Sequence, residues 1–494
     1  MKYLKINPAD NVAVVLEALQ SGEVLIVDGV NIVVGADIPM GHKIALNNIA
    51  ANEYIIKYGY PIGHARVDIK MGDWVNETTV KTNLEGLLDY EYKPQDVSLD
   101  IPDRKLTFRG YKRANGEVGV RNEIWVIPTV GCVNGTINAL AEKLRQETQL
   151  KNVDAIVSYP HNYGCSQLGD DHENTRKVLR NMVLHPNAGG VLVVGLGCEN
   201  NQVKAFKKLL GNYDESRIKF IETQKVDDEY EEGMKLLREI YDVVSKDVRE
   251  DVAVAELKIG LKCGGSDGFS GITANPLLGV FSDFLIAQGG STVLTEVPEM
   301  FGAETILMNR CVNKNMFDKT VHLINDFKDY FMRNNQAVYE NPSPGNKAGG
   351  ISTLEEKSLG CTQKCGKALV KDVLMYGERI KIKGLNLLSA PGNDLVASTA
   401  LGASGCHIVL FTTGRGTPFG SFVPTMKIST NTPLYKRKGS WIDFNAGTIV
   451  ENESIEQVKE RFADYVIKVA SGELVNNEKK NYREIAIFKT GVTL

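Results

Sequence analysis

The sequence predicts an α/β protein in which a small β-rich N-terminal module precedes two α/β domains with mainly parallel sheets. Its 494 residues exceed what one hydrophobic core accommodates. Short apolar runs alternate with turn residues up to about Gly72, and after Arg109 apolar runs lead through glycine turns into helical stretches. We therefore expect a module at 1–75, an extended linker at 76–105, a first α/β domain at 106–252 and a second at 253–494.

The N-terminal module is predicted from strands at 23–27 and 30–34, and its turns carry His42 and His64. The polar stretch that follows contains Pro94 and few periodic apolar positions, which is typical of a connector between domains.

Strand, glycine turn and helix succeed one another in both predicted α/β domains. Residues 123–128 lead through a glycine turn into a helix at 137–148, and residues 191–194 lead through another into 202–210. In the second domain, residues 257–261 run into Cys263-Gly264-Gly265. Side chains that follow such strands lie at the edge where open α/β sheets bind ligands.

Composition excludes several classes of function. A formal net charge of −4 and a pI near 6.1 leave no basic surplus to neutralise phosphates, so we expect no nucleic-acid partner. No run of about 18 apolar residues is found and the first residues lack an apolar signal core, so we expect no membrane partner and a cytoplasmic location. The eight cysteines are then expected to be free thiols or metal ligands.

Glycine-rich loops provide the candidate anion sites. The loop at 264–271 exposes backbone N–H groups around Gly265 and Ser266, but it lacks the Gly-Lys-Ser/Thr ending of a nucleotide-binding P-loop. Arg415 lies in a second rigid glycine turn, where its planar fork suits a substrate carboxylate. A turn of small residues capped by Asp267 is the structural alternative for the first loop.

A divalent metal with open coordination positions is predicted instead of a closed zinc site. No Cys-x-x-Cys pair recurs, and His161 and Cys165 lie four residues apart in a loop that contains glycine. Histidine, carboxylate and water ligands would leave room for substrate oxygens.

Four longer motifs carry a resemblance to a known family. They are 57–63 (KYGYPIG), 113–123 (RANGEVGVRNE), 161–167 (HNYGCSQ) and 299–304 (EMFGAE). Together they resemble the altronate/galactarate dehydratase family, and the likeness extends from the first residues to the C-terminal end. The resemblance implies an N-terminal SAF-type β-clip module, a divalent metal that is usually iron (Fe2+, with Mn2+ as the alternative) and removal of water from a sugar acid.

The chemistry implied is the conversion of D-altronate to 2-dehydro-3-deoxy-D-gluconate and water in hexuronate (galacturonate) breakdown. It needs a base for the proton beside the carboxylate, an acid for the leaving hydroxyl and positive charge for the enediolate. As catalytic residues we expect His42, His64, Lys43 and Tyr163. As metal ligands we expect His161, Cys165, Glu199, Asp267 and His407. As substrate-binding residues we expect Gly265, Ser266, Asn200, Lys347, Gln363, Lys364, Asn393 and Arg415.

Three alternatives remain open at this point. Galactarate or another hexarate would need a second cation, which Lys347 or Lys364 supplies. A lysine-based lyase would form a Schiff base, and a sugar-acid sensor would bind without turnover. A homo-oligomer is expected only from the general frequency of symmetric assemblies.

Overall fold

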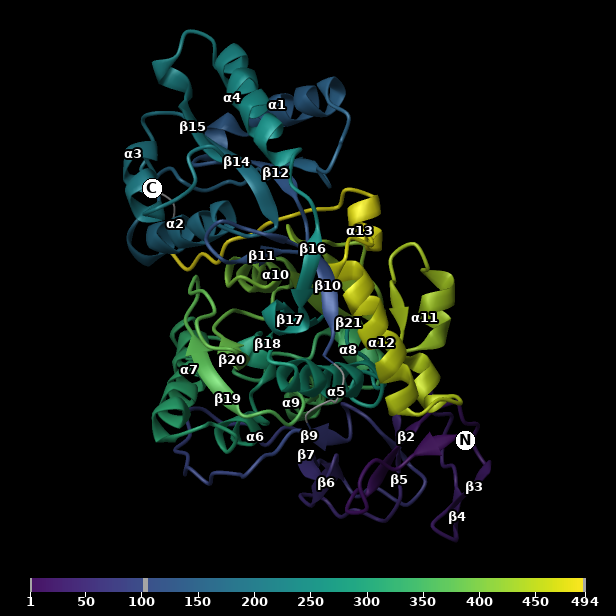
Figure 1. Ribbon diagram of the computed structural model, residues 1–494. Helices are drawn as coiled ribbons and strands as arrows, with labels where there is room; N and C mark the ends of the chain where they lie inside the picture. The colour runs from purple at the N-terminus through teal and green to yellow at the C-terminus, as the bar shows by residue number, and fades with distance from the viewer. Residues whose placement is uncertain (1, 101–104, 492–494) are drawn as a thin grey trace.

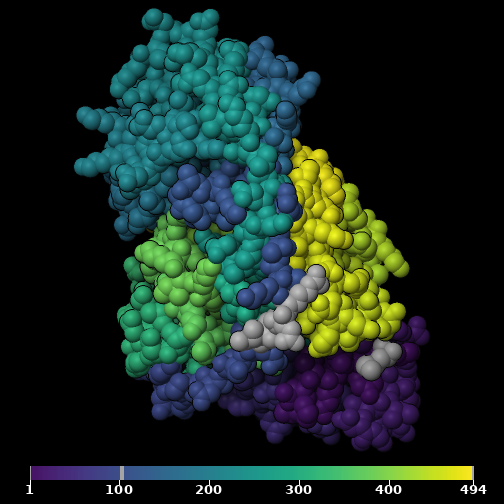
Figure 2. Space-filling model, viewed as in Figure 1, coloured from purple at the N-terminus to yellow at the C-terminus, as the bar shows by residue number. Residues whose placement is uncertain are grey.

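The computed structural model describes residues 2–100 and 105–491. Positions 101–104 of the predicted linker, and the terminal positions 1 and 492–494, lie outside the described residues. Figure 1 shows the first α/β domain at the top, the second in the middle and the N-terminal module at the bottom. In the space-filling view the module packs directly against the second α/β domain (Figure 2).

The N-terminal module consists of three small antiparallel sheets. Its strands are β1 (Tyr3–Leu4), β2 (Val12–Val15), β3 (Val24–Val27), β4 (Val30–Val33), β5 (Lys43–Ala45), β6 (Tyr54–Lys57), β7 (Tyr60–Ala65), β8 (Trp74–Val75) and β9 (Val80–Lys81). Alternating burial along β3 and β6 shows that one face of each hairpin packs inward. Because β9 pairs with β7, the sheet continues into the segment predicted as a linker.

The first α/β domain is a parallel sheet of strand order β13-β12-β14-β15. Its strands are β12 (Glu123–Pro128), β13 (Ile156–Ser158), β14 (Ala188–Gly195) and β15 (Ile218–Glu222), and its helices are α1 (Asn134–Glu147), α2 (Gly169–Val183), α3 (Val203–Leu210) and α4 (Glu229–Val244). Helices α1 and α4 share a core with one face of the sheet, and α2 and α3 share a core with the other. Both faces are covered, as parallel strands require.

A small antiparallel sheet links the two α/β domains. It consists of β10 (Thr107–Lys112), β11 (Val118–Gly119) and β16 (Glu250–Ala253). The chain enters the first domain after β10 and β11 and leaves it through β16, so the domain is inserted between paired strands.

The second α/β domain is built on a seven-stranded parallel sheet of order β19-β20-β18-β17-β21-β22-β23. Its strands are β17 (Lys258–Cys263), β18 (Ser291–Leu294), β19 (Val370–Leu374), β20 (Gly384–Leu388), β21 (Ile408–Thr413), β22 (Thr425–Ser429) and β23 (Phe444–Asn445). Its helices are α5 (Ala274–Ala287), α6 (Glu304–Met308), α7 (Lys314–Arg333), α8 (Pro344–Ala348), α9 (Leu354–Thr362), α10 (Asp394–Ala403), α11 (Thr432–Arg437), α12 (Ile455–Ala470) and α13 (Asn476–Lys479). The predicted fold class is therefore confirmed.

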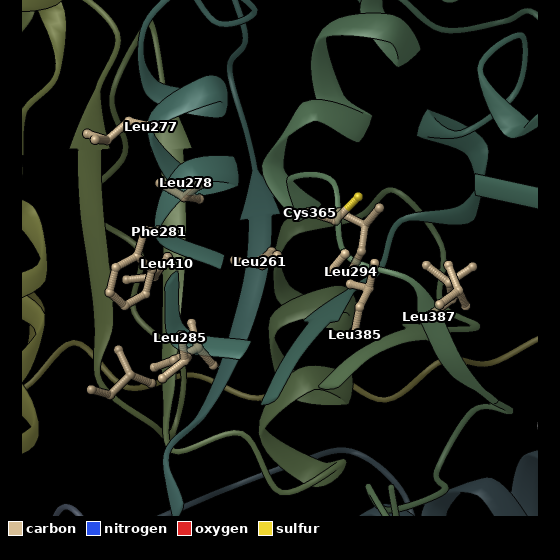
Figure 3. Packing of buried hydrophobic residues seen from close by; sticks show 14 of the residues in the cluster. Leu261, Leu277, Leu278, Phe281, Leu285, Leu294, Cys365, Leu385, Leu387 and Leu410 are labelled. Atoms are coloured by element: carbon tan, nitrogen blue, oxygen red, sulfur yellow. The ribbon is translucent and has the colours of Figure 1, made fainter. Parts of the chain in front are cut away.

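Apolar residues of α5 pack against the central strands of this sheet. Figure 3 shows Leu277 and Phe281 of the helix beside Leu261 and Leu410 of the strands, and all four side chains belong to one buried cluster. Burial of such side chains stabilises the fold by roughly 1.5–3 kcal/mol each. The packing fixes the carboxyl ends of the strands, where the site residues lie.

The two α/β domains also share a core. Trp125 of the first domain packs edge-on against Phe422 of the second, with ring centroids 5.6 Å apart. The C-terminal segment at 485–488 has no regular secondary structure and crosses to the first domain, where the Tyr163 hydroxyl donates to the Ile487 carbonyl at 3.1 Å. Within the described part of the chain, no helix is long and apolar enough to cross a membrane.

Candidate active site

Charged residues meet where β17 and β18 end. Lys262 donates from Nζ to Oε1 of Glu296 at 2.6 Å and to Oδ1 of Asp394 at 2.8 Å. The other Glu296 oxygen accepts the backbone N–H of Cys263 at 3.0 Å. Glu296 has a left-handed backbone with φ of 68°, which costs free energy for a residue with a β-carbon. This turn directs the short helix η4 (Val297–Glu299) into the site.

Two thiols and a carboxylate converge next to this turn. The Sγ atoms of Cys263 and Cys361 are 3.3 Å apart, and both thiols donate to Oε2 of Glu299, at 3.0 and 3.3 Å. All three residues are buried, and their three ligand atoms lie within 4.8 Å of one another. Two sulfurs and one oxygen suit a thiophilic divalent ion such as zinc or iron. The donor set therefore fits a divalent metal.

Two buried lysines flank these three ligand atoms. Lys364 donates to Sγ of Cys263 at 2.8 Å, and Lys357 contacts Oε1 of Glu299 at 2.7 Å. Burial raises the pKa of the Glu299 carboxyl, but the positive charges of Lys357 and Lys364 outweigh burial and bring that pKa to about 2. The contact with Cys263, followed by burial, raises the pKa of the Cys361 thiol well above its usual value. A bound cation would compete with both ammonium groups.

The N-terminal module reaches this cluster through a shared carboxylate. Lys43 donates to Oε2 of Glu356 at 2.9 Å, and Lys57 donates to Oε1 at 2.7 Å. Glu356 lies on α9, the helix that also carries Lys357 and Cys361. Burial lowers the pKa of Lys43 to about 8, with Glu356 opposing the shift, whereas the charge of Glu356 outweighs burial at Lys57 and raises its pKa. One helix therefore connects the module to the thiols.

A small cavity lies at the junction of the module and the second domain. Its volume is about 10 Å³, roughly the space of one water molecule. Lys57, Lys357, Cys361 and Ser266 line it. Among residues 2–100 and 105–491, the buried Ser266 hydroxyl finds no hydrogen-bond partner. Because an unpaired buried hydroxyl is costly, this group indicates a place for a polar ligand.

Asp267, a predicted metal ligand, lines the same cavity with its oxygens already hydrogen-bonded. Oδ1 accepts from the Ser270 hydroxyl at 3.1 Å, and Oδ2 accepts from Thr430 and Asn431 at 2.9 and 3.1 Å. Burial raises the pKa of the Asp267 carboxyl despite these bonds. Its contacts are those of a residue that organises the glycine-rich loop, and its role as a ligand stays a prediction.

Several other predicted residues lie around this junction. Nε2 of His42 is 3.4 Å from the Ala348 carbonyl of α8, and Nδ1 accepts from Trp74 at 3.2 Å. Burial, reinforced by the charge of Lys43, lowers the pKa of His42, so its ring is neutral. Lys347 also lies on α8.

The remaining predicted substrate-binding residues differ in their contacts. Arg415 is exposed beside Gly265, with its Cβ 3.2 Å from where a β-carbon of that glycine would lie. Gln363 donates to the Gly271 carbonyl at 3.1 Å. Asn393 caps α10 by accepting from two backbone N–H groups. His64, predicted to be catalytic, contacts Oδ1 of Asn83 at 2.7 Å.

A second group of predicted residues lies in the first domain, at the carboxyl edge of its sheet. The second domain separates the first domain from the N-terminal module (Figure 1). Nε2 of His161 donates to the Pro128 carbonyl at 2.8 Å and its Nδ1 accepts from the Tyr163 N–H at 3.1 Å. Burial lowers the pKa of His161 to about 4. Oε1 of Glu199 accepts from Thr129 at 2.6 Å, and Asn200 accepts from a neighbouring loop.

His407 belongs to neither group. It precedes β21, and its Nδ1 accepts the backbone N–H of Lys258, the first residue of β17. Cys263 is the last residue of β17, so the two lie at opposite ends of a six-residue strand, about 17 Å apart at 3.3 Å per residue. The structure therefore does not bring His407 together with the thiols.

Sequence reasoning missed the residues that form the buried cluster. It singled out the loop after Cys263, and Gln363 and Lys364 shortly after Cys361, but assigned roles to neither thiol. Glu296 and Glu299 lie in a stretch where only the family motif at 299–304 drew attention. Lysines are mostly exposed, so nothing in the sequence marked Lys262 or Lys357 as buried.

Fold and site together define a three-part α/β protein with a buried junction suited to an anionic ligand and a divalent cation. Comparison with known proteins agrees for each part. Residues 1–83 match the altronate/galactarate dehydratase SAF domain, residues 110–245 match the D-galactarate dehydratase/altronate hydrolase second domain, and residues 254–493 match the D-galactarate/altronate dehydratase C-terminal domain.

Full-length relatives have the same organisation. The chain is 59% identical to altronate dehydratase of Bacillus subtilis, over 100% of this chain and 99% of the relative. It is 54% identical to altronate dehydratase of Escherichia coli, over 100% of both chains. It is 34% identical to galactarate dehydratase (L-threo-forming) of Escherichia coli, over 95% of this chain and 93% of the relative. The chain belongs to the altronate/galactarate dehydratase family, as the sequence motifs indicated.

Proposed function

We propose that this protein is a hydro-lyase that converts D-altronate to 2-dehydro-3-deoxy-D-gluconate and water. The proposal rests on identities of 59% and 54% to two altronate dehydratases over the whole chain, against 34% to a galactarate dehydratase. The observation from the structure that carries it is the junction cavity, which Lys57, Lys357 and the unpaired Ser266 line.

The substrate carboxylate is the group that the junction recognises. Lys57 and Lys357 line the cavity, and the acidic partners of both raise their pKa values, so both carry positive charge at neutral pH. Charge-assisted hydrogen bonds to a carboxylate are roughly twice as strong as neutral ones. The Ser266 hydroxyl then gains a partner among the substrate hydroxyls. Because the cavity is small, substrate entry requires the module and the second domain to separate slightly.

Proton transfer requires one group that loses a proton and one that gains it. Lys357 remains protonated beside the cavity and is placed to donate a proton to the departing hydroxyl. Lys43 has a pKa of about 8, so it changes protonation near neutral pH, and it shares Glu356 with the cavity residue Lys57. We therefore assign Lys43 to the group of residues that accepts the proton removed from the substrate.

Cys263, Glu299 and Cys361 would hold the divalent ion, for which we propose Fe2+, with Mn2+ as the alternative. Such an ion supplies a Lewis acid for the negative charge that develops on the substrate oxygens. The thiol-rich donor set favours iron over manganese. Lys364 balances the charge of this set because its ammonium group contacts Cys263.

A substrate panel tests the proposal. The full-length protein, purified without oxygen and supplied with Fe2+, is incubated with D-altronate, galactarate, D-mannonate and D-gluconate, and 2-keto-3-deoxy acid is measured. We expect D-altronate to have the highest kcat/KM. A preference for galactarate would make the protein a galactarate dehydratase. Borohydride trapping of substrate on a lysine would instead indicate a Schiff-base lyase. Tight binding without turnover would indicate a sugar-acid sensor and not an enzyme.

A further inference from the structure

Three cysteines lie at one edge of the first α/β domain. Cys132, Cys165 and Cys198 follow β12, β13 and β14, and they are exposed, whereas the other five cysteines are buried. The strands are parallel neighbours in the order β13-β12-β14. Parallel strands end at the same edge about 4.8 Å from their neighbours, so the sheet presents the three thiols on one surface.

Hydrogen bonds join the three loops that carry these cysteines. The N–H of Gly131 donates to the Tyr163 carbonyl at 3.0 Å, which connects the Cys132 loop to the Cys165 loop. The N–H of Asn201 donates to the Gly164 carbonyl at 3.2 Å, which connects the Cys165 loop to the Cys198 loop. A further bond at 2.8 Å runs from the Ser166 N–H to Oδ1 of Asn200. The bonded residues are next to, or within three positions of, the cysteines.

The polar residues nearest to the thiols are already committed to the protein. Both nitrogens of His161 are hydrogen-bonded, and the two oxygens of Glu199 accept from Thr129 and from the N–H groups of Leu196 and Gly197. Asn201 differs, because its buried Oδ1 has no partner in the described part of the chain. The thiols have only long contacts: Sγ of Cys198 accepts from Gln224 at 3.5 Å, and Sγ of Cys165 is 3.8 Å from the Ser166 hydroxyl. The unpaired Asn201 oxygen lies among the same loops.

Two kinds of metal site differ in how closely their ligand atoms gather. Ligand atoms of a single ion must crowd together, and within the described residues the group that does so is Cys263, Glu299 and Cys361. Cys132, Cys165 and Cys198 come from three separate loops and form no such group. Separate thiolates that each bind a different metal atom are the arrangement of an iron–sulfur cluster.

We propose that Cys132, Cys165 and Cys198 bind a cluster of the 4Fe–4S type, with its fourth iron open to an oxygen ligand such as the hydroxyl or carboxylate of a hydroxy acid. Binding of a preassembled cluster from a thiolate-ligated donor is a ligand exchange: the sulfurs of the three thiols bond to three irons, three donor thiolates leave those irons and take up the three protons, and no oxidation state changes. Gln224 donates to Sγ of Cys198 at 3.5 Å, a contact of the kind that tunes cluster potentials.

Helix dipoles favour the charge of such a cluster. Helices α1, α2 and α3 begin at Asn134, Gly169 and Val203, each shortly after one of the cysteines. Their amino ends carry partial positive charge and face the edge where three thiolates would gather. Asp170 and Asp171 in the first turn of α2 oppose this field, but Asp171 is hydrogen-bonded to the N–H groups of Thr490 and Gly491.

Chemical analysis of the full-length protein tests the proposal directly. Protein purified without oxygen should be brown and contain about four acid-labile sulfides per chain, with about four irons in addition to any ion held by Cys263, Glu299 and Cys361. On reduction it should give the electron paramagnetic resonance signal of a reduced cluster. Protein that lacks acid-labile sulfide as purified, and that takes up none from a preassembled cluster donor, would overturn the proposal, whether or not it carries zinc.

Cysteine variants identify the ligands. Cys132→Ser, Cys165→Ser and Cys198→Ser should each reduce sulfide content and visible absorption sharply, and the triple variant should abolish both while its circular dichroism spectrum is unchanged. Cys361→Ser is the matched control, because it removes a thiol of the other site and should keep the cluster. Retention of the cluster in the triple variant, or its loss in Cys361→Ser alone, would assign it elsewhere.

The cluster and the proposed dehydration can fail separately. A cluster on a protein that does not dehydrate D-altronate leaves this inference intact and removes the function. Dehydration by a protein free of sulfide keeps the function and removes the cluster.

Discussion

Lys43 and Lys57 lie on different strands of the N-terminal module and bind the two oxygens of one carboxylate, Glu356, at 2.9 and 2.7 Å. The side chains of all three are at most 1% exposed. Two ammonium groups with one carboxylate leave positive charge buried at the junction. This relationship explains how a β module contributes to a site whose other residues come from the α/β sheet.

Glu356→Gln should destabilise the protein by about 3–5 kcal/mol, because it leaves two buried ammonium groups without a counter-charge. Chemical denaturation followed by circular dichroism measures the loss. Arg238→Ala is the control, since its ion pair with Glu147 is at the surface, where solvent screening leaves such pairs little effect on stability. Equal effects of the two substitutions would show that Glu356 is not required to balance the lysines.

Lys43 should make stability depend on pH between about 8 and 10.5. The folded state binds the Lys43 proton less tightly than the unfolded chain does, because burial lowers its pKa from 10.5 to about 8. Deprotonation therefore favours folding, and the contribution of Lys43 to stability rises with pH across that window. The difference in unfolding free energy between wild type and Lys43→Met isolates this contribution. A difference that stays flat from pH 7 to pH 10 would contradict the lowered pKa.

Lys357→Gln should lower kcat for D-altronate by about 100-fold, the lower end of the range for loss of a general acid. Lys436→Gln, which changes an exposed lysine of α11, is the control and should leave kcat unchanged. Initial rates of 2-keto-3-deoxy acid formation provide the measurement. A Lys357→Gln enzyme with normal kcat and raised KM would restrict Lys357 to carboxylate binding.

Co2+ should report on the thiol and carboxylate ligands of the junction. Thiolate-bound Co2+ has a charge-transfer absorption, so titration of metal-free protein should produce this band in wild type and not in Cys361→Ser. Cys198→Ser is the control and should keep the band, since its thiol lies in the other domain. If Cys361→Ser and Cys198→Ser both kept the wild-type band, the cobalt would be bound by neither of these cysteines.

The sequence predicts the layers of this fold better than its junctions. Apolar runs such as residues 257–261 and their glycine turns specify strands and the edge where their side chains emerge. Local patterns do not show which edge meets the N-terminal module, since Cys263 and Cys361 are separated by 98 positions and meet only after the sheet forms. Asp267 and His161 have the residue types of ligands, yet their polar atoms bind loop donors and acceptors.

The buried lysines also show that local sequence patterns do not identify the site residues. Lys262 lies in an apolar strand, and a lysine there is ordinarily expected to reach solvent. Its burial depends on Glu296 and Asp394, which are 34 and 132 positions away. Sequence alone therefore indicates that ligand-type residues gather at strand ends, and the structure shows which of them share one cavity.

The KM of Ser266→Ala for D-altronate is the most direct test of the claim that the substrate binds at the junction of the N-terminal module and the second α/β domain. The Ser266 hydroxyl has no hydrogen-bond partner among the described residues, so its removal should not lower the unfolding midpoint. Loss of a substrate hydrogen bond worth about 1.4 kcal/mol should raise KM about tenfold. An unchanged KM in a fully folded Ser266→Ala enzyme would contradict the account.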